Sequence, residues 1–238
     1  MCGIVGYVGE RDCTDVLLDS LSKLEYRGYD SAGIAVFENG EITVEKAKGE
    51  LKNLREKVAE HKPMGHCGIG HTRWATHGEP SDINSHPHGN KRVSIVHNGI
   101  IENYQELKDK LIKSGYAFYS QTDTEIAVKL VDYYYRKTGT PLEAISRAML
   151  RIRGSYAFGI MFHDHPGKIF AARKDSPLII GKSQTGCLIA SDVPAILDKT
   201  RNVYYIGNHE IAELSQDEIH FYNIDREEIQ KEQVEIKW

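Results

Sequence analysis

The chain lacks the sequence features of several broad classes of protein. Only four of its 238 residues are cysteine, and they form no CxxC pair. Such scattered cysteines argue against a disulfide framework and fit a reducing, cytoplasmic location. No apolar stretch is long enough to span a bilayer, and we expect no signal peptide. The net charge of −4 gives no indication of binding to nucleic acid or to an anionic membrane surface.

Signatures of nucleotide and metal sites are also missing. There is no GxxxxGK[ST] loop, and Gly3, Gly6 and Gly9 do not make a GxGxxG motif. Histidine is abundant in one segment, at His61, His66, His71, His77, His86, His88 and His97. No HExxH motif accompanies them, and Cys67 has no nearby partner. We therefore predict neither a metal nor a cofactor.

The order of predicted elements indicates an α+β fold. Strands are expected over residues 3–8, 32–37, 41–46, 67–74, 92–97, 155–162, 168–172, 178–181, 187–190, 203–206, 210–214 and 218–222. Helices are expected over 14–26, 51–60 and 141–150, and from capping patterns at Asn103 and Thr122. Asn39-Gly40 predicts a hairpin. Because strands cluster at both ends without βαβ alternation, we expect layers with largely antiparallel sheets. We assign residues 1–224 to one domain and the charged residues 225–238 to the start of a linker.

Cys2 is the strongest candidate for a catalytic residue. It follows Met1 directly, and methionine is commonly removed before a small residue. Removal would leave residue 2 with a thiol of pKa about 8.5 and a free α-amine of pKa about 7.7–8.0. An amine in this range suits proton transfer to and from the thiol. The alternative is a buried cysteine that acts as a small hydrophobe in a first strand.

A second candidate follows a predicted strand, at His97-Asn98-Gly99. The Asn98 amide and the Gly99 N–H could point at a developing negative oxygen, as in an oxyanion hole. The alternative is a tight hairpin turn, which Asn-Gly favours. Against that alternative, Ile100 and Ile101 lead straight to the helix expected from Asn103.

Two charged residues could bind an α-amino acid. Arg73 could hold a carboxylate through two parallel N–H bonds, although a surface salt bridge is the commoner role of a single arginine. Asp123 could bind an ammonium group, or it could complement a helix dipole in the first turn, worth about 0.3–1 kcal/mol. Trp74 could be a lid or a core residue, and its size favours the core. Together with Cys2, these groups suit glutamine, an α-amino acid with a side-chain amide.

The sequence resembles the glutaminase domains of the glucosamine-6-phosphate synthase family, a branch of the class II amidotransferases. The matching segments are Met1 to Gly6, Leu24 to Gly33, Gly70 to Pro80, His86-Pro87-His88, Val96 to Tyr104, Thr122 to Glu125, Ser176-Pro177-Leu178 and Ala190-Ser191-Asp192. Cys2 with Asn98-Gly99 is common to the class. Tyr26 to Ser31 and Thr72 to His77 resemble the sugar-phosphate branch more narrowly.

The resemblance implies a four-layer αββα sandwich of the N-terminal nucleophile hydrolase type. It implies hydrolysis of glutamine through a Cys2 γ-glutamyl thioester, with the ammonia passing to fructose-6-phosphate in the full-length enzyme. By the same match Arg73 and Asp123 bind the substrate, with further contacts from Thr76, His77, Gly99 and His86. Arg27 and Gly28 would lie on a loop that closes over the site, and Trp74 where ammonia leaves.

The family's chains continue into sugar isomerase domains and are expected to form homodimers, whereas this chain stops at Trp238. We expect it to be an excised domain rather than the product of a truncated gene. Two other readings stay open: the glutaminase domain of another class II amidotransferase, such as a phosphoribosyl-pyrophosphate amidotransferase, or a non-catalytic module that binds glutamine or metal.

Overall fold

The computed structural model describes residues 2–237, and its strands form two antiparallel sheets. Sheet A contains, in spatial order, β15 (Val234–Glu235), β11 (Asn202–Tyr205), β9 (Ile179–Lys182), β10 (Gly186–Ala190), β1 (Gly3–Gly9), β4 (Cys67–Arg73), β2 (Ser31–Glu38) and β3 (Glu41–Lys48). Sheet B contains β14 (Glu228–Ile229), β13 (Ile219–Tyr222), β12 (Glu210–Leu214), β8 (Ile169–Lys174), β7 (Gly154–Phe162), β6 (Val93–Ile101) and β5 (His88–Gly89).

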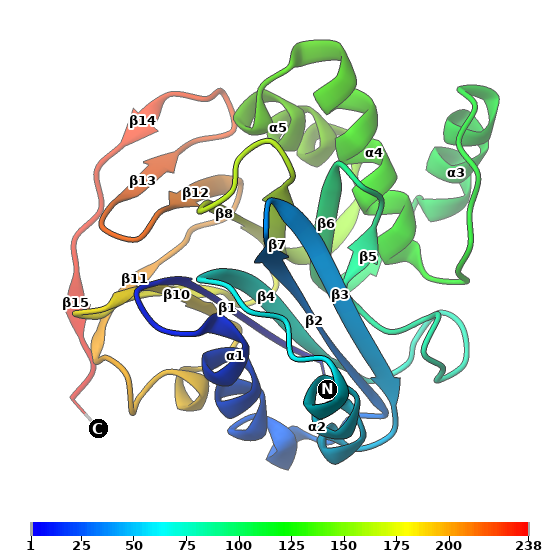
Figure 1. Ribbon diagram of the computed structural model, residues 1–238. Helices are drawn as coiled ribbons and strands as arrows, with labels where there is room; N and C mark the ends of the chain where they lie inside the picture. The colour runs from blue at the N-terminus through cyan, green and yellow to red at the C-terminus, as the bar shows by residue number, and fades with distance from the viewer. Residues whose placement is uncertain (1, 238) are drawn as a thin grey trace.

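The sheets and helices stack as four layers (Figure 1). Helices α1 (Cys13–Ser22) and α2 (Leu51–Glu60) cover the outer face of sheet A. Helices α3 (Tyr104–Lys113), α4 (Asp123–Thr138) and α5 (Pro141–Arg151) cover sheet B. A third apolar cluster lies between the two sheets. The αββα sandwich expected from the resemblance is therefore confirmed.

The central strand β1 shows why the sequence folds in this way. Its seven residues are all buried, because one face packs on α1 and the other on sheet B. Val5 and Tyr7 belong to the helix-side cluster, and Ile4 and Val8 belong to the cluster between the sheets. Each such Ile or Val contributes about 1.5–3 kcal/mol when fully buried. A strand buried on both faces has a nearly continuous apolar sequence. This buried strand fixes the position of Cys2, the residue that precedes it.

The predicted local structure agrees with most of the observed elements. The hairpin at Asn39-Gly40 is confirmed, with φ of 51° and 81° at the two residues, as a type I′ turn requires. The cap at Thr122 is confirmed, since its hydroxyl accepts the Glu125 N–H at 3.3 Å. Asn103 is the N-cap residue of α3 as predicted, but its side chain makes no capping hydrogen bond and instead bonds the backbone of residues 151 and 153. The first helix ends at Ser22 rather than Tyr26, and a separate 3-10 turn covers Glu25–Arg27.

The charged C-terminal segment lies against both sheets. Strand β14 pairs with β13, and β15 pairs with β11. Ile236 is buried in the cluster beneath sheet A. The boundary at residue 224 and the linker beyond it stay predictions.

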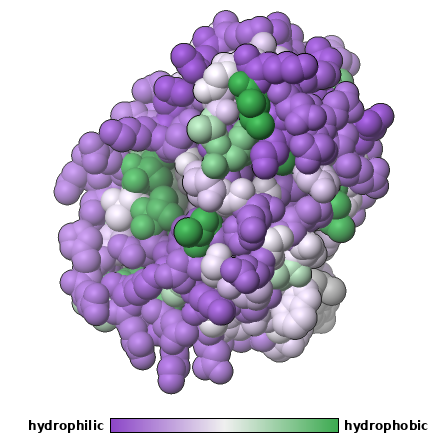
Figure 2. Space-filling model, turned by 90° about the vertical axis from the view of Figure 1, so that its right-hand side faces the viewer, coloured by the Kyte–Doolittle hydropathy of each residue, from purple (hydrophilic) through white to green (hydrophobic). Residues whose placement is uncertain are grey.

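The face shown in Figure 2 is mostly hydrophilic, and its apolar residues form small separate groups. Within residues 2–237, no helix has the length and hydropathy needed to cross a membrane.

Candidate active site

The candidate site lies where the two sheets meet at one end of the sandwich. Gly3 pairs with Thr72 in sheet A, so Cys2 lies beside Arg73 and Trp74 at the end of β4. Asn98 reaches Cys2 from β6 in the facing sheet, with its Nδ2 donating to the Cys2 carbonyl oxygen at 3.2 Å. Residues 2, 73 and 98 are distant in sequence, and they lie together because sheet A packs face to face on sheet B.

The Cys2 thiol is partly buried against the segment that leaves β4. The Trp74 N–H lies 3.2 Å from Sγ, and the Trp74 carbonyl oxygen lies 3.5 Å from it. Burial raises the pKa of the thiol, an effect that the Trp74 N–H and the Arg73 charge partly offset. The resting side chain is thus a thiol rather than a thiolate, and nucleophilic attack needs a base. Met1 lies outside the described residues, so its predicted removal stays a prediction.

Asn98 and Gly99 do not form a hairpin turn. Both lie within β6, where Asn98 pairs with Ala157 and Gly99 pairs with Tyr156 of β7. Gly99 has a φ of +116°, and a Cβ there would lie 2.3 Å from the Ser155 carbonyl oxygen. Only glycine fits this position without strain, and the hairpin interpretation is wrong.

Arg73 is not a surface residue, so the salt-bridge interpretation is wrong as well. Its side chain is buried, and its guanidinium donates to three backbone carbonyls of the following loop, those of His77, Gly78 (3.2 Å) and Glu79 (3.3 Å). Asp30 steadies the same segment: its N–H donates to the Arg73 carbonyl at 2.7 Å, and its Oδ2 accepts the Ala75 N–H at 2.8 Å.

Asp123 opens α4 and faces the same site. Its carboxylate accepts the Ile101 N–H at 2.9 Å, which ties the helix start to the end of β6. The side chain is buried, so a carboxylate here does more than complement a helix dipole at the surface. It offers a buried negative charge near Cys2.

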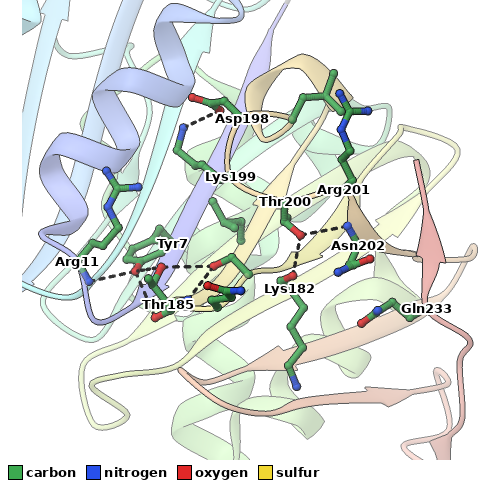
Figure 3. A pocket seen from close by; sticks show the side chains of 14 residues that line it. Tyr7, Arg11, Lys182, Thr185, Asp198, Lys199, Thr200, Arg201, Asn202 and Gln233 are labelled. Carbon is green, nitrogen blue, oxygen red and sulfur yellow. Dashed lines mark hydrogen bonds and ion pairs between the residues drawn. The ribbon is translucent and has the colours of Figure 1, made fainter. Parts of the chain in front are cut away.

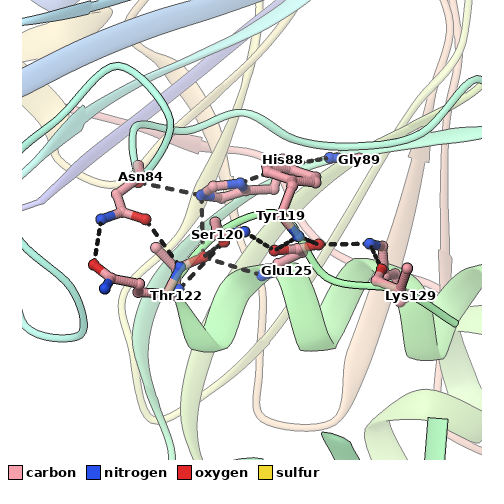
Figure 4. A network of polar contacts seen from close by, with 10 residues as sticks. Asn84, His88, Gly89, Tyr119, Ser120, Thr122, Glu125 and Lys129 are labelled. Atoms are coloured by element: carbon pink, nitrogen blue, oxygen red, sulfur yellow. Dashed lines mark hydrogen bonds and ion pairs between the residues drawn. The ribbon is translucent and has the colours of Figure 1, made fainter. Parts of the chain in front are cut away.

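A polar network fixes the start of α4 (Figure 4). The Glu125 carboxylate accepts the Tyr119 and Ser120 N–H groups and pairs with Lys129 at 2.5 Å. The Thr122 hydroxyl lies 3.1 Å from His88 Nε2. Glu125 and His88 are buried. The network holds the loop before α4 and thereby the position of Asp123.

A small cavity adjoins Cys2, with a volume of about 20 Å³, close to the space that one water molecule needs. It is lined by Cys2, Arg73, Trp74, Thr76, His86, His97, Gly99, Thr122, Asp123 and Thr124. The predicted residues Cys2, Arg73, Thr76, His86, Gly99 and Asp123 are thus brought together.

Four predicted site residues lie outside this lining: Asn98, which contacts the Cys2 backbone, and Arg27, Gly28 and His77. Arg27 faces Ser191, at 3.4 Å, and Asp192, at 3.8 Å, and Gly28 follows it. The His77 ring packs edge-on to Tyr104, at 5.0 Å between centroids, while its carbonyl serves Arg73. Their roles with the substrate stay predictions. Trp74 is 54% exposed, so the core interpretation of this residue is wrong.

Four of the histidines in the predicted histidine-rich segment are buried together. His71, His86, His88 and His97 are each 4% exposed or less. The His71 and His86 rings stack at 3.9 Å, and burial lowers the pKa of all four. Within residues 2–237, no three or more His, Cys, Asp or Glu side chains converge as metal ligands.

A larger cavity, of about 720 Å³, lies elsewhere, over sheet A between the end of β9 and the loop that precedes β11 (Figure 3). Two of its lysines are already engaged: Lys199 pairs with Asp198 and Asp19, and Lys182 donates to the Asp217 carbonyl. None of the predicted site residues lines it. Volume alone therefore does not identify the reactive site.

Several residues that contact and position the predicted site residues were not identified from the sequence. Asp30, His71, Thr124 and Glu125 lie within the matching segments but were assigned no role in the site. The signals for His71 were its place in the segment Gly70 to Pro80 and in the dense run of histidines, and neither indicates a contact with Asn98.

The comparisons with known proteins agree with the geometry. Residues 71–198 match the family model described as a glutamine amidotransferase domain. The chain belongs to this family. Over its whole length it is 53% identical to the glutamine–fructose-6-phosphate aminotransferase (isomerizing) of Clostridium acetobutylicum and 45% identical to that of Pyrococcus horikoshii. It spans only 39% and 40% of the length of those relatives.

Solved amidotransferase structures share the fold. The phosphoribosylpyrophosphate amidotransferase of B. subtilis, solved with ADP and GMP, superposes with a TM-score of 0.80 at 24% identity. That match covers 94% of this chain and 49% of the other. A class II glutamine aminotransferase domain protein from Silicibacter pomeroyi gives a TM-score of 0.65 at 13% identity, over 94% of this chain and 99% of that one.

Proposed function

We propose that this chain hydrolyses L-glutamine to glutamate and ammonia, with Cys2 as the nucleophile. One observation carries the proposal. The Cys2 side chain adjoins a cavity that Arg73, Gly99 and Asp123 also line, and the Asn98 amide lies beside it. This set supplies a nucleophile, two oppositely charged binding groups and two oxyanion donors.

The reaction proceeds in two displacements. Cys2 Sγ attacks the glutamine carboxamide carbon while its proton passes to the Cys2 α-amine. The carbonyl oxygen becomes negative and is stabilised by the Asn98 amide and the Gly99 N–H. Collapse breaks the C–N bond, and the amine returns the proton so that ammonia leaves. Water then attacks the thioester and gives up a proton to the amine. Cleavage of the C–S bond releases glutamate, and the proton returns to Sγ.

The charged groups bind the substrate at its α-carbon. Arg73 holds the carboxylate, and Asp123 holds the ammonium, since each offers a buried charge of the required sign. Thr76, His77 and His86 add polar contacts, and Arg27 and Gly28 belong to a loop over the site. A cavity of about 20 Å³ cannot hold glutamine, so residues 74–79 must move for it to enter. Trp74 lies where that movement would also release ammonia.

The acceptor proposed for the ammonia is fructose-6-phosphate, in a longer protein that carries sugar isomerase domains and forms a homodimer. The support is the activity of the relatives, of whose length this chain spans 39–40%. The segments that resemble the sugar-phosphate branch specifically, such as Tyr26 to Ser31, favour this acceptor over that of phosphoribosyl-pyrophosphate amidotransferases. A cytoplasmic location rests on four cysteines that are all unpaired.

The test is a glutaminase assay with covalent labelling. Protein that begins at Cys2 should release ammonia from glutamine, and 6-diazo-5-oxo-norleucine should add once, at Cys2. Cys2→Ala should abolish both, whereas Cys187→Ala, at a buried cysteine away from the site, should retain both. Labelling of Cys13, Cys67 or Cys187, or turnover by Cys2→Ala, would overturn the assignment.

A further inference from the structure

The geometry points to His71 as the residue that orients the Asn98 amide, so that its N–H groups rather than its oxygen face the reacting carbonyl. His71 is a positioning residue, because it touches Asn98 and not the substrate. The inference rests on the proposed glutaminase function. It concerns a residue of β4 that contacts β6 across the gap between the sheets.

The proton on the His71 ring can be placed from its neighbours. Nε2 lies 3.0 Å from the His97 carbonyl oxygen, which can only accept a hydrogen bond. Nε2 must therefore carry a proton. The same nitrogen lies 3.0 Å from the Asn98 side chain. A donor there requires the Asn98 oxygen, and not its nitrogen, to face His71.

The other end of the amide agrees with this orientation. When Oδ1 faces His71, Nδ2 faces the Cys2 carbonyl oxygen at 3.2 Å and donates to it. A flipped amide would set two donors together at His71 and two acceptors together at Cys2. Both neighbours thus select one orientation. The amide nitrogen carries a second N–H, which is left for the oxyanion.

The surroundings hold His71 itself in one position. The ring is fully buried and stacks on His86 at 3.9 Å, with the planes 9° apart. His86 Nδ1 accepts the His97 N–H at 3.2 Å, so the proton of His86 lies on Nε2, 3.3 Å from the Thr124 hydroxyl. Burial lowers the pKa of His71 to about 3, which keeps the ring neutral at physiological pH. The Asn98 contact needs a proton on Nε2, and the neutral ring placed by these neighbours supplies it.

Two variants of similar polarity separate this role from simple core packing. Glutamine at position 71 can place an N–H near the Nε2 position, whereas asparagine is one methylene shorter and cannot reach Asn98. We expect His71→Asn to lower kcat about 10–100-fold with little change in KM, approaching the loss typical of an oxyanion donor. His71→Gln should recover most of kcat.

A double-mutant cycle with Asn98→Ala provides the decisive measurement. If His71 acts through Asn98, His71→Asn should lower kcat less than about twofold in the Asn98→Ala background. The matched control is His88→Asn, at a buried histidine that bonds Asn84 and Thr122 rather than Asn98. Its effect should be the same in both backgrounds.

The possible outcomes distinguish this inference from the function on which it rests. Absence of glutaminase activity in the wild-type chain beginning at Cys2 would overturn the proposed function. If Asn98→Ala lowers kcat as expected, a loss of kcat by the same factor for His71→Asn in both backgrounds would overturn the His71 role alone. So would equal kcat values for His71→Gln and His71→Asn when thermal unfolding shows both to be folded.

Discussion

The two halves of the site are held in different ways. Cys2, Asn98 and Gly99, the strand half, lie on or next to strands whose register is fixed by sheet pairing, β1 between β10 and β4 and β6 along β7. Residues 73–79, the loop half, leave β4 and include the exposed Trp74. Arg73 holds that loop through backbone carbonyls that a substrate carboxylate would have to replace.

This difference distinguishes the residues that carry out the reaction from those that bind the substrate. Groups that must meet a transition state need positions fixed before the substrate arrives, and strands provide them. Groups that admit and enclose a substrate must be able to rearrange, and loops allow that. Damage to the strand half should therefore lower kcat, and damage to the loop half should raise KM.

Retention of Met1 should have the largest effect on the strand half. A peptide bond to Met1 converts the α-amine of Cys2 into an amide, which cannot take the thiol proton. The raised pKa of the buried thiol leaves little thiolate to react without that base. We expect a preparation that retains Met1 to be inactive by ammonia release, with intact mass spectrometry reporting the N-terminus. Full activity with Met1 attached would exclude the free-amine mechanism.

Asn98→Ala should have the next largest effect. It removes a donor to the oxyanion, which costs about 10²–10³-fold in kcat, or about 2.7–4 kcal/mol of barrier. KM should change little, since the interaction forms in the transition state. Thermal midpoint and kcat should be measured on one preparation. A lowered midpoint with kcat close to wild type would assign Asn98 a purely structural role.

Arg73→Lys tests the loop half. Lysine keeps the charge but loses the planar pair of N–H groups. Hydrogen bonds to charged groups are worth about 1.5–3 kcal/mol, so KM for glutamine should rise about 10–100-fold with a smaller change in kcat. Asp123→Asn should act in the same direction by leaving the ammonium unpaired. Arg11→Lys, in the larger cavity, is the control and should leave KM unchanged.

The sequence allowed prediction of the features that local pattern and chemistry determine. Alternating and continuous apolar runs gave the strands, Asn39-Gly40 gave the hairpin, and the pairing of Cys2 with Asn98 and Arg73 gave the site. The four-layer arrangement came from the resemblance. What could not be predicted depends on which strands lie side by side: Gly99 needs its φ of +116° because Ser155 lies against it, and no local signal reports that contact.

The supporting residues were missed for a related reason. A buried histidine such as His71 is defined by its neighbours His86, His97 and Asn98, which come from other strands and loops. In the sequence it is one of seven histidines between residues 61 and 97. Burial of these histidines also makes the free energy of unfolding depend on pH, which the sequence alone does not show.

Stability should fall as the pH falls below about 6.5, and His71 should account for a measurable part of this loss. An unfolded histidine binds a proton near pH 6.5, whereas buried His71 stays neutral until its pKa of about 3. Between these values the unfolded state binds more protons, so the free energy of unfolding rises with pH and is lost on acidification. Each such histidine contributes a slope of about 1 kcal/mol per pH unit between pH 5 and 6. Denaturant unfolding across that range should give a slope smaller by this amount for His71→Gln than for wild type.

The partly exposed His220 is the matched control for this slope. Hydrogen bonds to Glu228 and Glu218 raise the pKa of this histidine. Both its folded and unfolded forms are therefore largely protonated between pH 5 and 6, and its contribution to stability is constant there. His220→Gln should leave the slope at its wild-type value. Equal slopes for wild type and His71→Gln would mean that His71 titrates normally in the folded protein. Protonation would leave the Nε2–H that contacts Asn98 in place, but it would put a charge against the stacked His86 ring, so equal slopes would contradict the burial of His71 in this stack.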